Sequence, residues 1–242
     1  MHHEYSQPQT AKRHQMAPHL TLYRANGSCS LAPHILLHEL ALPFTTILLK
    51  PASPGGGSYA AADGSFTHAW YRANINPLGL VPALAVGTST TPAVIVTEMP
   101  AILTYLASLA PERGLAGVGE LERAGTVAWC AWLSGTLHGI GFGGLWRPGR
   151  FAEGVEGERM VVARAPETIR GCFERVELRL GEEGGEVAVK DFYLYVFFRW
   201  GEQIGMPMAE RYPRYAARMR VVEGRESVRR AVGVEGVGLL FG

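Results

Sequence analysis

A cysteine stands where a strand is predicted to meet a helix, in the stretch Asn26-Gly27-Ser28-Cys29-Ser30-Leu31-Ala32-Pro33-His34. The residues Leu20 to Tyr23 before it are typical of a short strand, and apolar residues at helical spacing follow it. Gly27 tolerates the left-handed backbone of a tight turn, and Pro33 suits the first turn of a helix. The pattern therefore places Cys29 at a helix N-terminus. Free N–H groups and the helix dipole would stabilise a thiolate there, belonging either to the protein or to a ligand.

The same turn excludes one kind of redox chemistry. Ala32 occupies the position three residues after Cys29, where a dithiol motif would carry its second cysteine. A dithiol–disulfide cycle is therefore excluded at this turn. Ser30 is either a plain helix-start residue or a hydroxyl donor to a sulfur atom, and the sequence leaves both readings open.

Composition favours a folded protein whose partners are small molecules. The chain has 242 residues, of which 47% are hydrophobic and 19% charged, enough for one large domain or two small ones. The formal charge is +1, from 23 basic and 22 acidic residues, so neither nucleic acid nor an anionic membrane is an expected partner. The three cysteines, Cys29, Cys130 and Cys172, are few and odd in number, which favours a reducing, cytoplasmic setting.

Neither the N-terminal residues nor the two long uncharged stretches of the sequence are typical of a membrane segment. Residues 1–19 are polar, so we expect a flexible tail and no secretory signal. The uncharged stretch 73–97 is interrupted by three prolines. The uncharged stretch 124–146 is expected to begin as a buried helix and to continue, at Gly139 to Gly144, as a glycine-rich loop. The histidines show no metal-ligand spacing, so no metal is expected.

The order of predicted elements changes once along the chain. A strand, a helix and a strand at Phe44 to Lys50 form a parallel unit, which is followed by a short helix over 65–73. Two further strands, 83–86 and 93–96, precede a helix that Thr97 is expected to cap. Beyond the Pro/Gly-rich linker 111–119 the strand signals fade, so residues 120–242 are expected to be helical.

Five stretches spread over residues 20 to 232 occur together in one protein family. They are Leu22-Tyr23 through Gly27 to Ile35; Ile75-Asn76-Pro77 with Gly79 and Val81-Pro82-Ala83-Leu84; Thr97-Glu98 with Ala101-Ile102 and Tyr105-Leu106; Leu121-Glu122-Arg123 with Trp129 and His138; and Asp191 with Tyr193-Leu194 and Arg199-Trp200. By these stretches the chain resembles the glutathione transferases, and within them most closely the bacterial β class. Their order and spacing together are specific, although each alone is weak.

The resemblance implies a fold and a co-substrate. It implies a thioredoxin-like α/β domain over 20–110, built as βαβ and ββα around a four-stranded mixed sheet. An all-α domain over 120–242 follows the linker. It also implies a homodimer that binds glutathione and a small apolar electrophile, without a metal.

The resemblance also assigns roles to individual residues. Val81, before a Pro82 that the family holds cis, would offer its backbone to the cysteinyl part of glutathione, as an added β-strand does, with Leu80 beside it. Met99 would offer a free N–H to the γ-glutamyl carboxylate, and Glu98 would pair with the ligand's α-amino group. The remaining roles are catalytic for Cys29, Ser30 and His138, contact with the apolar substrate for Tyr23, Phe142 and Trp146, and structural for Pro82 and Asp191.

Three functions follow from these expectations. The first is an enzyme that adds the thiolate of glutathione to an apolar electrophile, either as conjugation or as glutathione-assisted isomerisation of a double bond. The second is a thiol-transferase with Cys29 as nucleophile, forming a mixed disulfide with glutathione. The third is a non-catalytic binding protein, because Met99, Ala131 and Gly139 replace residues that are commonly small or polar in the family. Ala188 likewise replaces a Ser or Thr that caps the central helix.

Overall fold

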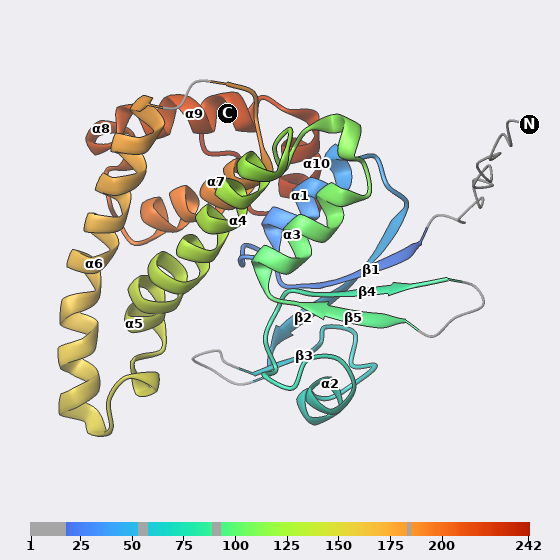
Figure 1. Ribbon diagram of the computed structural model, residues 1–242. Helices are drawn as coiled ribbons and strands as arrows, with labels where there is room; N and C mark the ends of the chain where they lie inside the picture. The colour runs from blue at the N-terminus through green and yellow to red at the C-terminus, as the bar shows by residue number, and fades with distance from the viewer. Residues whose placement is uncertain (1–17, 53–57, 89–92, 183–184) are drawn as a thin grey trace, which may run out of the picture.

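The computed structural model describes residues 18–52, 58–88, 93–182 and 185–242. A small mixed sheet with three helices forms one half of the molecule, and a group of helices forms the other (Figure 1). Most of the expected N-terminal tail, residues 1–17, lies outside the described residues, as do parts of the predicted loops at 53–57, 89–92 and 183–184. The fold is thioredoxin-like in its first part and all-helical in its second.

The sheet has five strands in the order β3-β2-β1-β4-β5. Strand β1 pairs in parallel with β2 and antiparallel with β4, while β2–β3 and β4–β5 are antiparallel pairs. The sequence predicts four strands, and the additional one is the edge strand β3. It has three residues, too few for a visible alternation of side chains. The strands are β1 (His19–Arg24), β2 (Phe44–Pro51), β3 (Tyr59–Ala61), β4 (Ala83–Gly87) and β5 (Val94–Thr97).

Helices cover both faces of the sheet. Helices α1 (Leu31–Glu39) and α3 (Met99–Ser108) lie on one face, and α2 (His68–Asn74) lies on the other (Figure 1). Thr97 was expected to cap α3, but it is the last residue of β5, and Glu98 holds the N-cap position instead. The pairing of Thr97 with Ala83 explains this difference, because it extends the strand by one residue.

The second half of the chain contains helices and connecting segments but no strand among its described residues. Its central helix, α7, is almost entirely buried, and Asp191 at its start accepts the Ala188 N–H at 2.8 Å and pairs with Arg218 at 2.7 Å. The N3 carboxylate therefore bonds the backbone where Ala188 lacks a capping hydroxyl. The elements are η1 (Pro111–Arg113), α4 (Glu120–Trp132), the π-helix η2 (Leu133–Phe142), α5 (Gly143–Trp146), η3 (Pro148–Arg150), α6 (Gly154–Glu182), α7 (Val189–Gln203), α8 (Met208–Arg211), α9 (Pro213–Glu223) and α10 (Glu226–Glu235).

The glycine-rich stretch 139–144 is helical, so the predicted loop is wrong. The helix widens into a π-helix, and the Gly143 N–H donates to the carbonyl of His138, five residues earlier. A Cβ added at Gly141 would lie 3.0 Å from Ile169 Cγ1, and one at Gly144 would lie 3.5 Å from Ala165 Cβ. The glycines therefore let this helix approach α6 closely. Turn propensity alone gives no sign of that contact.

The described residues contain neither a helix suited to a membrane nor a cluster suited to a metal. No helix among them is long and apolar enough to cross a membrane. Nor do His, Cys, Asp and Glu side chains gather, within the same residues, into a group of three or more that could hold a metal ion.

Candidate functional site

The turn between β1 and α1 is built from its own hydroxyl groups and backbone. Gly27 has a φ of 68°, the left-handed conformation that the sequence predicts for it. The Ser30 hydroxyl is fully buried and lies 3.1 Å from both the N and the O of Ala25 and 2.7 Å from the Ser28 hydroxyl. Ser30 does not line the cleft described below, so of its two readings the structure favours the helix-start residue over the donor to a sulfur atom.

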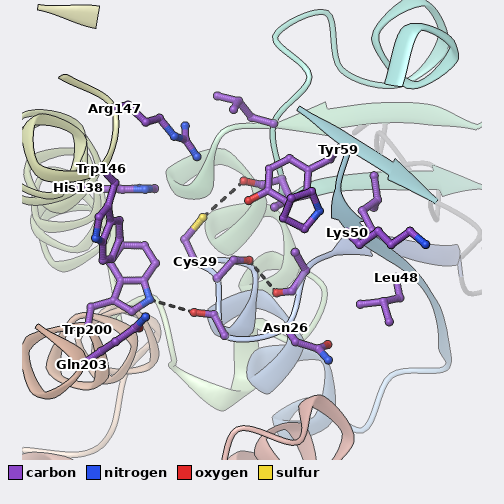
Figure 2. Close-up of a pocket in the computed structure, with 17 residues that line it drawn as sticks. Asn26, Cys29, Leu48, Lys50, Tyr59, His138, Trp146, Arg147, Trp200 and Gln203 are labelled. Carbon is purple, nitrogen blue, oxygen red and sulfur yellow. Dashed lines mark hydrogen bonds between the residues drawn. The ribbon is translucent and has the colours of Figure 1, made fainter. Parts of the chain in front are cut away.

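The helical domain holds this turn in place. The Gly27 N–H donates to Glu235 Oε2 at 2.8 Å, and the Gly27 carbonyl accepts from Trp200 Nε1 at 2.9 Å (Figure 2). Both polar groups of Gly27 are therefore bonded from α10 and α7. Glu235 Oε1 also lies 2.9 Å from His34 Nδ1 and 3.9 Å from Arg24 Nη1. The position of the cysteine turn thus depends on residues about two hundred positions away in sequence.

Cys29 is a buried, neutral thiol. Its Sγ lies 3.4 Å from the carbonyl oxygen of Val81 (Figure 2). Burial raises the pKa of Cys29 to about 12, although the charge of Arg147 and the N–H groups at the helix start act to lower it. Burial therefore keeps the thiol of Cys29 protonated at neutral pH, which favours a ligand's thiolate over the protein's own at this helix start.

Cys29 lies at the bottom of a cleft between the sheet domain and the helices. The cleft has a large lobe of about 440 Å³ and a small lobe of about 170 Å³. Both lobes are lined by residues from the two domains. The residues common to both lobes are Cys29, Leu80, Val81, His138, Trp146 and Arg147.

The sheet-domain wall presents backbone at the places where the sequence predicts a peptide-like ligand. The Val81–Pro82 bond is cis, and β4 begins only at Ala83, so Val81 lies outside the register pairs of the sheet. The preceding carbonyl, that of Leu80, accepts from the Tyr71 hydroxyl at 2.9 Å and the Asn76 amide at 2.8 Å. These two bonds hold the segment against the domain and leave Val81 facing the cleft.

The start of α3 forms the end of the small lobe. Glu98 has a φ of 69°, which is uncommon for a residue with a side chain, and such strained positions cluster at binding sites. Glu98 and the buried Met99 both line the small lobe, together with Asn76 and Pro82. A carboxylate and the free N–H groups of a helix N-terminus therefore lie side by side.

The helical-domain wall is aromatic around one neutral histidine. His138 and Trp146 line both lobes and Phe142 lines the small lobe, with the Phe142 ring 4.8 Å from that of Trp146. Burial, and then the charges of Arg147 and Arg150, lower the pKa of His138 to about 4. Its Nδ1 lies 3.3 Å from the Tyr193 hydroxyl, so at neutral pH an uncharged imidazole is part of this wall.

Tyr23, like Ser30, is a predicted site residue that the structure places outside the cleft. It packs in a separate core on the other face of the sheet, with ring centroids 5.7 Å from Tyr71 and 6.4 Å from Phe66. The alternation of strand β1 explains this placement, because Leu20 and Leu22 point to the face covered by α1. Tyr23 does not line either lobe, so its predicted contact with the apolar substrate is wrong.

The cleft also contains residues that sequence reasoning missed. Arg147 and Arg150 are two of them, and they come directly after the uncharged stretch 124–146. The change from uncharged to charged residues is the one sequence feature that could have indicated them. The others are Lys50, Tyr59, Ser134, Tyr193, Trp200 and Gln203, which come from strands and helices far apart in sequence.

A thioredoxin-like sheet domain is followed by a helical domain, and the cleft lies between them. This is the architecture that the resemblance to the glutathione transferases implies. Residues 27–109 match the family model "Glutathione S-transferase, N-terminal domain". A glutathione transferase from Methylococcus capsulatus is 30% identical, with a TM-score of 0.73, over 90% of this chain and 100% of that one. The chain belongs to the glutathione transferase family.

Two further solved structures refine the comparison. A bacterial β-class glutathione S-transferase from Sphingomonas chungbukensis is 28% identical over 90% of this chain and all of that one, with a TM-score of 0.73. A sphingomonad glutathione S-transferase, solved in complex with glutathione, is 29% identical over the same share of each chain, with a TM-score of 0.70. The resemblance to the bacterial β class is therefore confirmed.

Proposed function

We propose that this protein binds glutathione along Val81 and activates its thiol for addition to an apolar electrophile. The observation that carries the proposal is the backbone edge at Val81, which lies outside the register pairs of the sheet and whose carbonyl oxygen lies 3.4 Å from the buried, neutral thiol of Cys29. An extended tripeptide can pair with such an edge as an added strand, which places its central sulfur next to Cys29. The glutathione-bound sphingomonad relative supports the identity of the ligand.

The two ends of the tripeptide have suitable partners in the cleft. The γ-glutamyl carboxylate is assigned to the N-terminus of α3 at Met99, and its α-amino group to the Glu98 carboxylate, both in the small lobe. An extended ligand then runs into the large lobe, where Lys50 offers a cation to the glycyl carboxylate. The ligand therefore spans both lobes with its thiol at the residues they share.

The activation step follows from the groups around the sulfur. The neutral Cys29 thiol can turn from the Val81 carbonyl and donate to the ligand's sulfur, and the positive charge of Arg147 acts in the same direction. These interactions favour the thiolate over the thiol. The proton of glutathione leaves to solvent, and the sulfur forms a bond to the electrophilic carbon. In conjugation the leaving group departs with its electron pair, whereas in isomerisation the sulfur itself leaves after rotation about the former double bond.

The aromatic wall supplies the place for the electrophile. Phe142 and Trp146 lie beside His138, which is uncharged at neutral pH and therefore does not repel an apolar partner. Trp146 remains 39% exposed, so its ring is accessible from the mouth of the cleft. An apolar, planar electrophile fits against these rings.

Product analysis with labelled glutathione tests the proposal. Incubation with a panel of aryl halides and activated alkenes is expected to give products that retain the label in conjugation, or an isomerised alkene without the label. Cys29→Ala is expected to retain measurable addition, because the reacting sulfur belongs to the ligand. Tight glutathione binding without turnover of any panel member would contradict the enzymatic proposal and support a binding protein. Loss of all activity in Cys29→Ala, with disulfide exchange in the wild type, would support a thiol-transferase.

A homodimer is the assembly that the family resemblance leads us to propose. Light scattering coupled to size-exclusion chromatography tests it directly. A mass near twice the 26.3 kDa of the chain supports the proposal, and a mass near 26.3 kDa contradicts it.

A further inference from the structure

Two arginines face the cleft from the segment that follows the aromatic wall. Arg147 comes at the end of α5 and lines both lobes, and Arg150 ends η3 and lines the small lobe. Figure 2 shows Arg147 on the same wall as His138 and Trp146, across the cleft from Tyr59 and Lys50. The pair therefore stands on the helical-domain side of the reacting position.

The positive charges of this pair have no carboxylate partner among the residues that the structure describes. Within the described part of the chain, no carboxylate forms an ion pair with either guanidinium. Among the described residues that line the small lobe, Glu98 is the one acidic side chain, and it stands at the start of α3. Two unpaired cations beside a partly enclosed cavity create a positive potential inside it.

The effects of the two charges on neighbouring groups show how close they are. Burial and then the charge of Arg147 lower the pKa of Arg150, so the two guanidiniums repel each other. Both charges also contribute to the low pKa of His138. An anion bound between the two arginines would remove this repulsion, and an arginine fork can bond a carboxylate through two N–H groups.

Glutathione, as placed above, leaves both guanidiniums without a carboxylate partner, although the charge of Arg147 also acts on its sulfur. Its γ-glutamyl carboxylate is assigned to α3 and its glycyl carboxylate to Lys50, both on the sheet-domain side. We propose that Arg147 and Arg150 form an anion-binding subsite for the second substrate. The preferred electrophile then carries a carboxylate on its apolar body. This inference rests on the proposed function and names the substrate class of the same site.

A matched pair of electrophiles tests the subsite. The carboxylate 4-chloro-3-nitrobenzoate and the neutral 4-chloro-3-nitrobenzamide have nearly the same shape but differ in the charge of one substituent, and each can lose chloride as glutathione's sulfur bonds to the ring carbon. Comparing the variant with the wild type cancels the difference in intrinsic ring reactivity. The measured quantity is the ratio of kcat/KM for the benzoate to that for the benzamide. We expect the Arg150→Gln variant to lower this ratio about tenfold, the effect of losing one charge-assisted hydrogen bond.

The control is Arg164→Gln, which removes an exposed arginine of α6 that pairs with Glu167 outside the cleft. It is expected to leave the ratio unchanged. An unchanged ratio in Arg150→Gln would overturn the proposal. So would a rise in the KM for glutathione that is equal with both electrophiles, because the arginines would then bind a carboxylate of glutathione itself.

Calorimetry with the two S-aryl glutathione products separates this inference from the proposed function. It measures binding whether or not the protein turns over. Wild type is expected to bind the carboxylate product about tenfold more tightly than the amide product, and Arg150→Gln is expected to lose that preference. Such a preference without turnover would contradict the enzymatic proposal yet support the subsite, whereas turnover with equal affinities would overturn the subsite alone.

Discussion

Glu235 is predicted to be the residue of the helical domain on which the cysteine turn most depends. Its carboxylate is fully buried and accepts the Gly27 N–H at 2.8 Å. The second oxygen lies 2.9 Å from His34 Nδ1 and 3.9 Å from Arg24 Nη1. One side chain of α10 therefore bonds the backbone of the turn, the first helix and the strand before it.

Two substitutions of Glu235 distinguish the contribution of its charge to stability from that of its hydrogen bonds. Glu235→Ala leaves the Gly27 N–H buried without an acceptor and removes the carboxylate beside the Arg24 guanidinium, which keeps its bond to Asn26 Oδ1 at 2.6 Å. Removing one partner of a buried charged pair costs about 3–5 kcal/mol of stability. Glu235→Gln keeps the shape and one acceptor oxygen, so its expected cost is smaller, about 1–3 kcal/mol. Both changes should also raise the KM for glutathione, because the turn carries Cys29.

Urea denaturation at neutral pH gives the free energy of unfolding for each variant. Glu226→Gln is the matched control, because Glu226 lies on the same helix with its side chain 75% exposed, and its substitution should change stability by less than about 0.5 kcal/mol. A cost below about 1 kcal/mol for Glu235→Ala, with an unchanged KM for glutathione, would refute the reasoning that the helical domain positions the turn.

Three further predictions use the same denaturation assay. His138 has a folded pKa of about 4 against an ordinary value of 6.5, so the unfolded chain binds the proton first as pH falls through this window. The wild type should lose up to about 3 kcal/mol there relative to His138→Phe, and parallel pH profiles would contradict the burial of a neutral imidazole. Gly141→Ala should destabilise by about 1–3 kcal/mol, because its Cβ would meet Ile169 at 3.0 Å. Gly171→Ala, with open space around it, should stabilise by about 0.4–1 kcal/mol, and equal effects at both glycines would contradict the close helix approach. Trp200→Phe loses the hydrogen bond to the Gly27 carbonyl, so it should lower the free energy of unfolding by about 1 kcal/mol more than Trp129→Phe does. Trp129 is the control because its Nε1 has no hydrogen-bond partner among the described residues. Equal losses in the two variants would show that the Trp200–Gly27 bond adds no stability.

The features that could be predicted from the sequence are those set by neighbouring residues. The turn at Gly27, the helix that follows Cys29 and the strand after Pro82 each depend on backbone preferences within a few positions. The same signals locate the cysteine, the Val81 segment and the start of α3. The βαβ and ββα units and the helical second half follow from the order of elements along the chain, whereas the thioredoxin-like form of the sheet domain was implied by the family resemblance.

The features that escaped prediction depend on contacts between distant segments. The Ser30 hydroxyl could point into the cleft or back into the turn, and only the folded turn decides between them. The glycines at 139–144 look like a loop until α6 is packed against them. The pKa of Cys29 also depends on the folded structure. The burial of the thiol raises this pKa by more than the N–H groups at the helix start lower it.

Ultraviolet thiolate absorbance at neutral pH tests most directly the claim that the activated sulfur belongs to the ligand. The free protein is predicted to show no thiolate band from Cys29, whose pKa is raised to about 12. Addition of glutathione to the wild type is predicted to produce a band that saturates at one thiolate per chain. A band that is already present without glutathione and disappears in Cys29→Ala would contradict the account.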